Sequence, residues 1–149
     1  MRPGFILVLF ILLVIVTSVF GKSSGEGNTN IAPQASRRFD IINQANYPSF
    51  TLVSTNLYGD FESPPPAPHE IGPESTYSFQ VKRDYFYITE AFATYNVVTR
   101  FREVIGSFEI KMRLNTHVPS TTIVSKVGSD FTLDNGNTYV YVRNFIPET

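Results

Sequence analysis

Large apolar and polar residues alternate along several segments of this chain, and this period of two restricts its fold more than any other feature. In residues 107–114 every second residue is large and apolar, and charged residues stand between them. Residues 76–81 repeat the pattern with aromatic and aliphatic side chains. Successive side chains of a β-strand point to opposite faces of its sheet. Both segments are therefore predicted to be strands with one buried and one solvent-facing side.

Other extended segments follow the same logic and are separated by turn signals. They are predicted at residues 38–43, 50–55, 85–89, 91–99, 121–126, 130–133 and 138–145. Between the last two, Asn135-Gly136 is expected to form a tight hairpin turn, since both residues tolerate positive φ. Residues 59–73 contain five prolines, which predicts a crossing from one sheet to another instead of an interior strand. Seven or eight short strands with turn-like connections predict an all-β fold, an antiparallel β-sandwich.

The N-terminal segment determines where this domain is expected to reside. Arg2 precedes an apolar run over residues 5–16, and Val19 and Gly21 place small residues before a cleavage site. We therefore expect a signal peptide at residues 1–21, a disordered linker at 22–36, rich in Gly, Ser and Asn, and one sandwich domain at 37–149. The protein is predicted to be secreted. The alternative is an uncleaved signal anchor, but the apolar run is shorter than the roughly 20 residues that span a bilayer.

Composition excludes several classes of function. The chain has no Cys, so disulfide-stapled scaffolds and thiolate chemistry are excluded. Its net charge of −1 gives no excess of positive charge that would attract nucleic acid, and no nucleic-acid partner is expected. Eight Tyr and thirteen Phe without any Trp favour a sandwich core held by aromatic packing.

No group of residues has the spacing of a catalytic or metal site. His69 and His117 both stand near prolines in polar segments, which predicts solvated loop histidines. Residues 130–137 lack the ligand spacing and closing Glu of a calcium loop. A glycosidase needs two carboxylates at a defined distance, and nothing in the sequence fixes the distance between the carboxylates of residues 60–74. We therefore expect a protein that is not an enzyme and carries no cofactor or metal.

Tyrosines beside cations are the remaining functional signal. Lys82 and Arg83 stand just before Tyr85 and Tyr87, and a second pair, Tyr139 and Tyr141, precedes Arg143. Amphipathic rings of this kind suit membrane interfaces and sugar-binding faces alike. The alternative is ordinary cross-strand packing in the sandwich. The predicted contact residues are Lys82, Arg83, Tyr85, Tyr87, Tyr139 and Tyr141.

The order of these segments resembles that of the aegerolysin family and the related actinoporin-like cytolysins, over residues 38–143. The resemblance is carried by Arg38-Phe39-Asp40-Ile41-Ile42-Asn43, Thr51-Leu52-Val53, Pro64-Pro65-Pro66, Ile71-Gly72-Pro73-Glu74-Ser75, Tyr77-Ser78-Phe79, Ile105-Gly106-Ser107-Phe108-Glu109-Ile110 and Thr138-Tyr139-Val140-Tyr141-Val142.

This resemblance implies a membrane-lipid ligand, often a sphingolipid, and in some members a pore-forming partner. The first functional hypothesis is therefore a secreted, non-enzymatic protein that recognises a membrane lipid or another cell-surface component. The second is a secreted carbohydrate- or protein-binding sandwich, such as an adhesion or host-interaction module. A third, a bulk structural protein, lacks the repeats that would support assembly.

Overall fold

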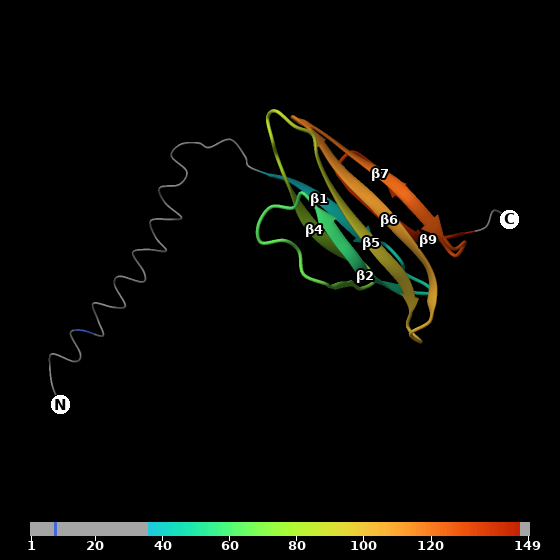
Figure 1. Cartoon of the computed structure of the whole chain (residues 1–149). Coiled ribbons are helices and arrows are strands. Elements are labelled where there is room, and N and C mark those ends of the chain that lie inside the picture. Colours follow the sequence, from blue (N-terminus) through green and yellow to red (C-terminus); the bar gives the residue numbers. More distant parts are fainter. Residues whose placement is uncertain (1–7, 9–35, 147–149) are drawn as a thin grey trace. The chain divides into compact units, whose positions relative to one another are not determined.

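Nine β-strands occupy residues 36–146 in the computed structural model, which describes these residues and Val8 (Figure 1). They are β1 (Ser36–Asn43), β2 (Phe50–Gly59), β3 (Glu70–Ile71), β4 (Ser75–Lys82), β5 (Thr89–Thr99), β6 (Val104–Asn115), β7 (Val118–Val127), β8 (Phe131–Asn135) and β9 (Tyr139–Asn144). The expected signal peptide lies outside the described residues except for Val8. The expected linker also lies outside them except for Ser36, where β1 begins.

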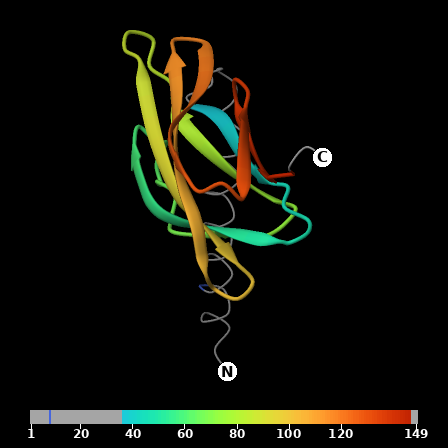
Figure 2. The same ribbon diagram turned by 90° about the vertical axis from the view of Figure 1, so that its right-hand side faces the viewer.

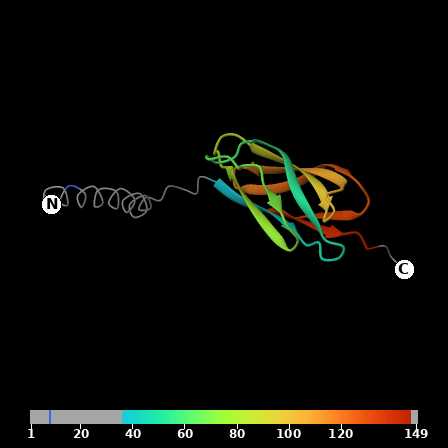
Figure 3. The same ribbon diagram turned by 90° about the horizontal axis from the view of Figure 1, so that it is seen from below.

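The strands form two sheets that pack face to face as a sandwich (Figure 3). One sheet has the order β4-β1-β9-β8 and the other has the order β3-β2-β5-β6-β7. The all-β sandwich expected from the alternating pattern is thereby confirmed. All paired strands are antiparallel except β1 and β9, which run parallel in the middle of the smaller sheet (Figure 2). Within the described ranges, no helix has the length and hydrophobicity to cross a membrane.

Most predicted strands are present, but residues 85–89 do not form one. Asp84 accepts hydrogen bonds at its Oδ1 atom from the backbone N–H groups of Phe86 (2.7 Å) and Tyr87 (3.1 Å). These bonds bend the chain, because a side chain that binds nearby backbone donors competes with strand pairing. The prediction of a strand at 85–89 was wrong, and β5 begins only at Thr89.

The predicted hairpin between the last two strands is present, but its turn lies two residues further on. Gly136 donates its N–H to the carbonyl of Tyr139 (2.8 Å), so Asn137 and Thr138 connect the strands. Neither Asn135 nor Gly136 has positive φ. Instead, Asn135 donates its side-chain amide to the carbonyl of Thr121 on β7 (2.9 Å), which ties the hairpin to the edge of the other sheet.

The proline-rich connection crosses between the sheets as expected. It leaves β2 in the larger sheet and enters β4 in the smaller one. On the way, Glu62 donates its N–H to the carbonyl of Gln80 (2.9 Å), and β3 pairs with the edge of β2. An edge position suits a two-residue strand that follows several prolines, since proline cannot complete a ladder.

The alternating residues of both sheets meet in one aromatic and aliphatic core. Phe131 of the smaller sheet packs against Phe50 and Phe108 of the larger one, with ring centroids 6.4 and 6.0 Å apart. Tyr95 stacks on Phe108 at 5.6 Å. All apolar residues of the pattern at 107–114 are at most 1% exposed, which confirms that strand's inward face. Their burial stabilises the fold by about 25 cal/mol per Å² of apolar surface.

One buried polar side chain, Asn43, joins the two sheets at the end of β1. Its Nδ2 atom donates hydrogen bonds to the carbonyls of Phe50 (2.8 Å) and Ile71 (3.0 Å), which lie on β2 and β3. Its Oδ1 atom accepts the N–H of Ala45 (3.0 Å). Asn43 is 0% exposed, so each of these backbone groups depends on it in place of water.

His69 is not the solvated loop residue that its sequence context predicts. Its ring stacks on Tyr77 with centroids 3.5 Å apart and planes 3° from parallel. The Nδ1 atom lies 2.8 Å from the carbonyl of Ala67, so Nδ1 carries the proton that the carbonyl accepts. In the neutral ring Nε2 then accepts the hydroxyl proton of buried Tyr95 at 2.6 Å. His69 thus fastens the proline-rich connection to the core.

This arrangement makes stability depend on pH. Partial burial lowers the pKa of His69 below its ordinary value of 6.5, because desolvation disfavours the charged ring. The unfolded chain therefore takes up a proton before the folded one does. The free energy of unfolding should be fully retained above pH 6.5 and fall as the pH drops through the lowered pKa. Urea titrations at a series of pH values should show this decline. In His69→Gln the decline should be smaller, and an unchanged decline would contradict the assignment to His69.

Candidate functional site

The connection between β4 and β5 lies at one end of the sandwich and contains Arg83, Tyr85 and Tyr87, and Lys82 ends β4 directly before it. In Figure 1 it is the yellow-green bend at the top, beside the turn between β6 and β7. Tyr85 contacts His117 of that turn with ring centroids 5.8 Å apart. The described chain also begins at this end, because Ser36 pairs with Lys82. The crossover between β4 and β5, the hairpin turn between β6 and β7 and the start of β1 therefore meet here.

Four consecutive large apolar residues project from this connection. Tyr85, Phe86, Tyr87 and Ile88, which we call the aromatic loop, are 46, 89, 74 and 46% exposed. Single exposed apolar residues are common on soluble proteins, whereas a contiguous exposed group points to a binding surface. The alternative of cross-strand packing does not apply to these rings, because residues 85–88 belong to no strand.

The base of the aromatic loop is held by hydrogen bonds. The Thr89 hydroxyl donates to the carbonyl of Lys82 across the neck of the loop (2.6 Å). Asp84 binds two backbone N–H groups inside it, as described above. The apolar side chains are thus presented on an ordered backbone, which reduces the conformational entropy that a partner must overcome on binding.

Two cations flank the aromatic loop. Lys82 is exposed, and Arg83 is half-buried with its Nε atom lacking a hydrogen-bond partner. In the part of the chain that the structure describes, neither forms an ion pair. The nearest acidic residue in sequence, Asp84, is occupied by the backbone. An apolar tip with cations at its base matches the layering of a membrane surface, where acyl chains lie beneath phosphates.

Tyr139 and Tyr141 lie on a different surface, the outer face of the smaller sheet. Their ring centroids are 5.0 Å apart, and the Arg143 guanidinium lies 4.6 Å above the Tyr141 ring. They project from β9 and are separated along the sheet from the loop that follows β4. The structure therefore divides the six predicted contact residues into two groups, four at the aromatic loop and two on this face.

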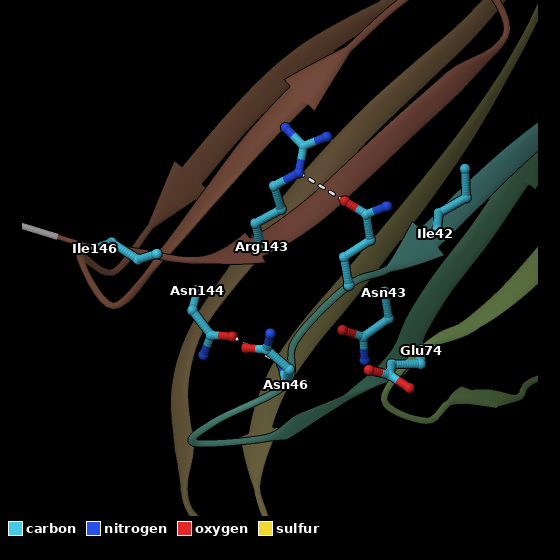
Figure 4. A pocket seen from close by; sticks show the side chains of 8 residues that line it. Ile42, Asn43, Asn46, Glu74, Arg143, Asn144 and Ile146 are labelled. Carbon is cyan, nitrogen blue, oxygen red and sulfur yellow. Dashed lines mark hydrogen bonds between the residues drawn. The ribbon is translucent and has the colours of Figure 1, made fainter.

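A polar hollow at the other end of the smaller sheet was not predicted. It has a volume of about 560 Å³ and lies where β1 and β9 end (Figure 4). Its lining residues are Ile42, Asn43, Gln44, Asn46, Glu74, Arg143, Asn144 and Ile146. A second hollow of about 550 Å³ adjoins it through Asn46, Asn144 and Ile146 and includes the exposed residues Tyr47 and Phe101.

The described groups at these surfaces are exposed aromatic rings, cations and hydrogen-bonding side chains. Within residues 36–146, no three His, Asp or Glu side chains are grouped so that they could hold a metal ion. Burial in the core strongly raises the pKa of the Tyr95 hydroxyl, which lies away from both surfaces. No protein-family model and no curated protein matches the chain.

Proposed function

We propose that the protein is a secreted, non-enzymatic binding protein of the aegerolysin or cytolysin-like type that docks on lipid membranes through its aromatic loop. The observation that carries this proposal is the run of four exposed apolar residues at 85–88, flanked by Lys82 and Arg83. Tyrosine rings favour the interface between headgroups and acyl chains, and Phe86 at the tip would reach deepest.

The expected affinity follows from the size of the loop. Burial of one large apolar side chain contributes about 1.5–3 kcal/mol. A cation near an anionic lipid surface adds about 1 kcal/mol. Three aromatic side chains and two cations therefore support reversible binding of one molecule after the cost of association has been subtracted. A pore-forming partner, which the family resemblance implies, would add avidity.

Vesicle flotation tests this proposal. The protein should float with vesicles that contain sphingolipid or anionic phospholipid. Removal of the anionic lipid should reduce the contribution of Lys82 and Arg83 to the binding free energy. Raising the salt concentration should reduce that contribution as well, because screening weakens surface charge interactions. Absence of flotation with sphingolipid, anionic and sterol-containing mixtures would refute membrane docking.

A second candidate, recognition of a cell-surface carbohydrate or protein, is favoured by Tyr139 and Tyr141 on the outer face of the smaller sheet. Tyr139 is 39% exposed. Its ring packs against Gly136, where a side chain would collide with the ring. An exposed tyrosine ring of this kind suits contact with a sugar ring. Glycan-array binding that survives loss of the aromatic loop would favour this candidate over membrane docking.

A further inference from the structure

The polar hollow at the end of the smaller sheet holds several fixed side chains with unused hydrogen-bonding groups. Arg143 donates from Nε to Gln44 (2.7 Å) and from a terminal nitrogen to Asp134 (2.9 Å). Asn144 accepts the N–H of Asn46 (3.0 Å) and donates to the carbonyl of Pro48 (2.7 Å). These contacts hold the side chains in place. They leave the Gln44 amide N–H groups and the second terminal nitrogen of Arg143 available to a ligand.

Glu74 supplies a carboxylate to the same hollow from an unfavourable backbone position. It follows Pro73 in a turn closed by the Ser75 N–H and the Gly72 carbonyl (3.2 Å), and its φ is +57°. Turns with positive φ at the third residue favour Gly or Asn there. A Glu at this position costs stability, and strained residues are retained where their side chains have a use. Among the described residues, the Glu74 carboxylate has no ion-pair partner.

The tyrosines of β9 continue the hollow along the sheet. Ile42, which lines the hollow, lies opposite Tyr141 on the neighbouring strand. Arg143, also in its wall, stacks on the Tyr141 ring. Tyr139 follows two residues away on the same face. A row of two aromatic rings therefore leads into a pocket of planar polar side chains, as Figure 4 shows for the pocket itself.

The charges around the hollow argue against an anionic ligand. Arg143 is already paired with Asp134, and the Glu74 carboxylate adds a further negative charge. A phosphate, sulfate or carboxylate would thus approach more negative than positive charge. A ligand with hydroxyl groups faces no such penalty, since it can donate to Glu74 and accept from Gln44 and Arg143.

We propose that this hollow, together with Tyr139 and Tyr141, binds a neutral oligosaccharide. Pairs of sugar hydroxyls bind the carboxylate, amide and guanidinium groups, and the C–H faces of the sugar rings lie on the negative faces of the tyrosine rings. The site develops the carbohydrate candidate above and does not depend on membrane docking, because its residues are separate from the aromatic loop.

The decisive variant is Glu74→Gly, measured on an array of neutral, sialylated and sulfated glycans. Glycine relieves the positive φ, so the melting temperature should stay equal or rise. Loss of a charged hydrogen bond should weaken binding of neutral glycans by about tenfold or more. Arg102→Gly is the matched control, because Arg102 also has positive φ (+68°) and is exposed. That variant should bind as the wild type does.

A second pair of variants tests the tyrosine row. Tyr139→Leu should weaken glycan binding, whereas Tyr58→Leu, on the outer face of the other sheet, should not. A Phe86→Ser variant should also bind glycans normally, which separates failure of this site from failure of membrane docking. The proposal is overturned if no neutral glycan binds, if only sialylated or sulfated glycans bind, or if folded Glu74→Gly binds neutral glycans as tightly as the wild type.

Discussion

Replacement of Asn43 by alanine is expected to lower the free energy of unfolding by about 3–4 kcal/mol. The variant leaves the carbonyls of Phe50 and Ile71 and the N–H of Ala45 without their partner. A buried polar group without a partner costs about 1–3 kcal/mol. The position is 0% exposed, so water cannot replace the amide without opening the contact between β1 and the larger sheet.

Urea unfolding of the wild type and Asn43→Ala measures this difference directly. Asn56→Ala is the matched control, since Asn56 is exposed on β2. Its free energy of unfolding should change by less than about 0.5 kcal/mol, as is usual for surface positions. A loss below about 1 kcal/mol in Asn43→Ala would show that the two sheets do not depend on this hydrogen-bonded bridge.

The double variant Phe86→Ser, Tyr87→Ser is expected to reduce partitioning onto membranes by about two to three orders of magnitude. Each side chain that no longer enters the bilayer interface removes about 1.5–2 kcal/mol, and about 1.4 kcal/mol corresponds to a factor of ten. The variant should fold normally, because Phe86 and Tyr87 are 89 and 74% exposed. Vesicle sedimentation over a range of lipid concentrations gives the partition coefficients.

Phe101→Ser is the matched control for this variant. Phe101 is 72% exposed, close to the 74% of Tyr87, but it lies in the turn between β5 and β6 at the opposite end of the sandwich. Its loss should leave the partition coefficient unchanged. Equal losses in both variants would instead indicate non-directional adsorption of exposed rings.

The strands could be predicted from the sequence where one face is buried and the other wet. On β6, charged Glu109 and Lys111 stand next to buried Phe108 and Ile110, so the period of two is clear and the prediction was confirmed. The segment at residues 85–89 was mistaken for a strand because its Tyr and Phe residues have high β-propensity. The Asp84 carboxylate accepts backbone hydrogen bonds there, and the alternation of apolar and polar residues does not predict such bonds.

The candidate sites could be predicted only in part. Lys82, Arg83, Tyr85 and Tyr87 are close in sequence, so their proximity followed from the chain itself. The polar hollow combines the end of β1, the turn at Glu74 and the end of β9. That juxtaposition depends on the parallel pairing of β1 with β9, across almost the whole length of the domain. No local pattern reports such pairing. The solvated-loop prediction for His69 was wrong for a similar reason, because its partner Tyr95 lies on β5, far along the chain.

Fluorescence from a single label at the tip of the aromatic loop tests the central claim most directly. The chain has no Cys, so a Cys introduced at position 86 or 101 is the only site for a thiol-reactive, apolar, polarity-sensitive dye. Membrane docking through the aromatic loop predicts a blue shift, and quenching by lipid-borne quenchers, for the label at 86 when sphingolipid or anionic vesicles are added. The label at 101 should remain in water. If the label at 86 keeps its aqueous spectrum while the protein is bound to vesicles, or if the label at 101 enters the bilayer instead, the aromatic loop is not the docking surface.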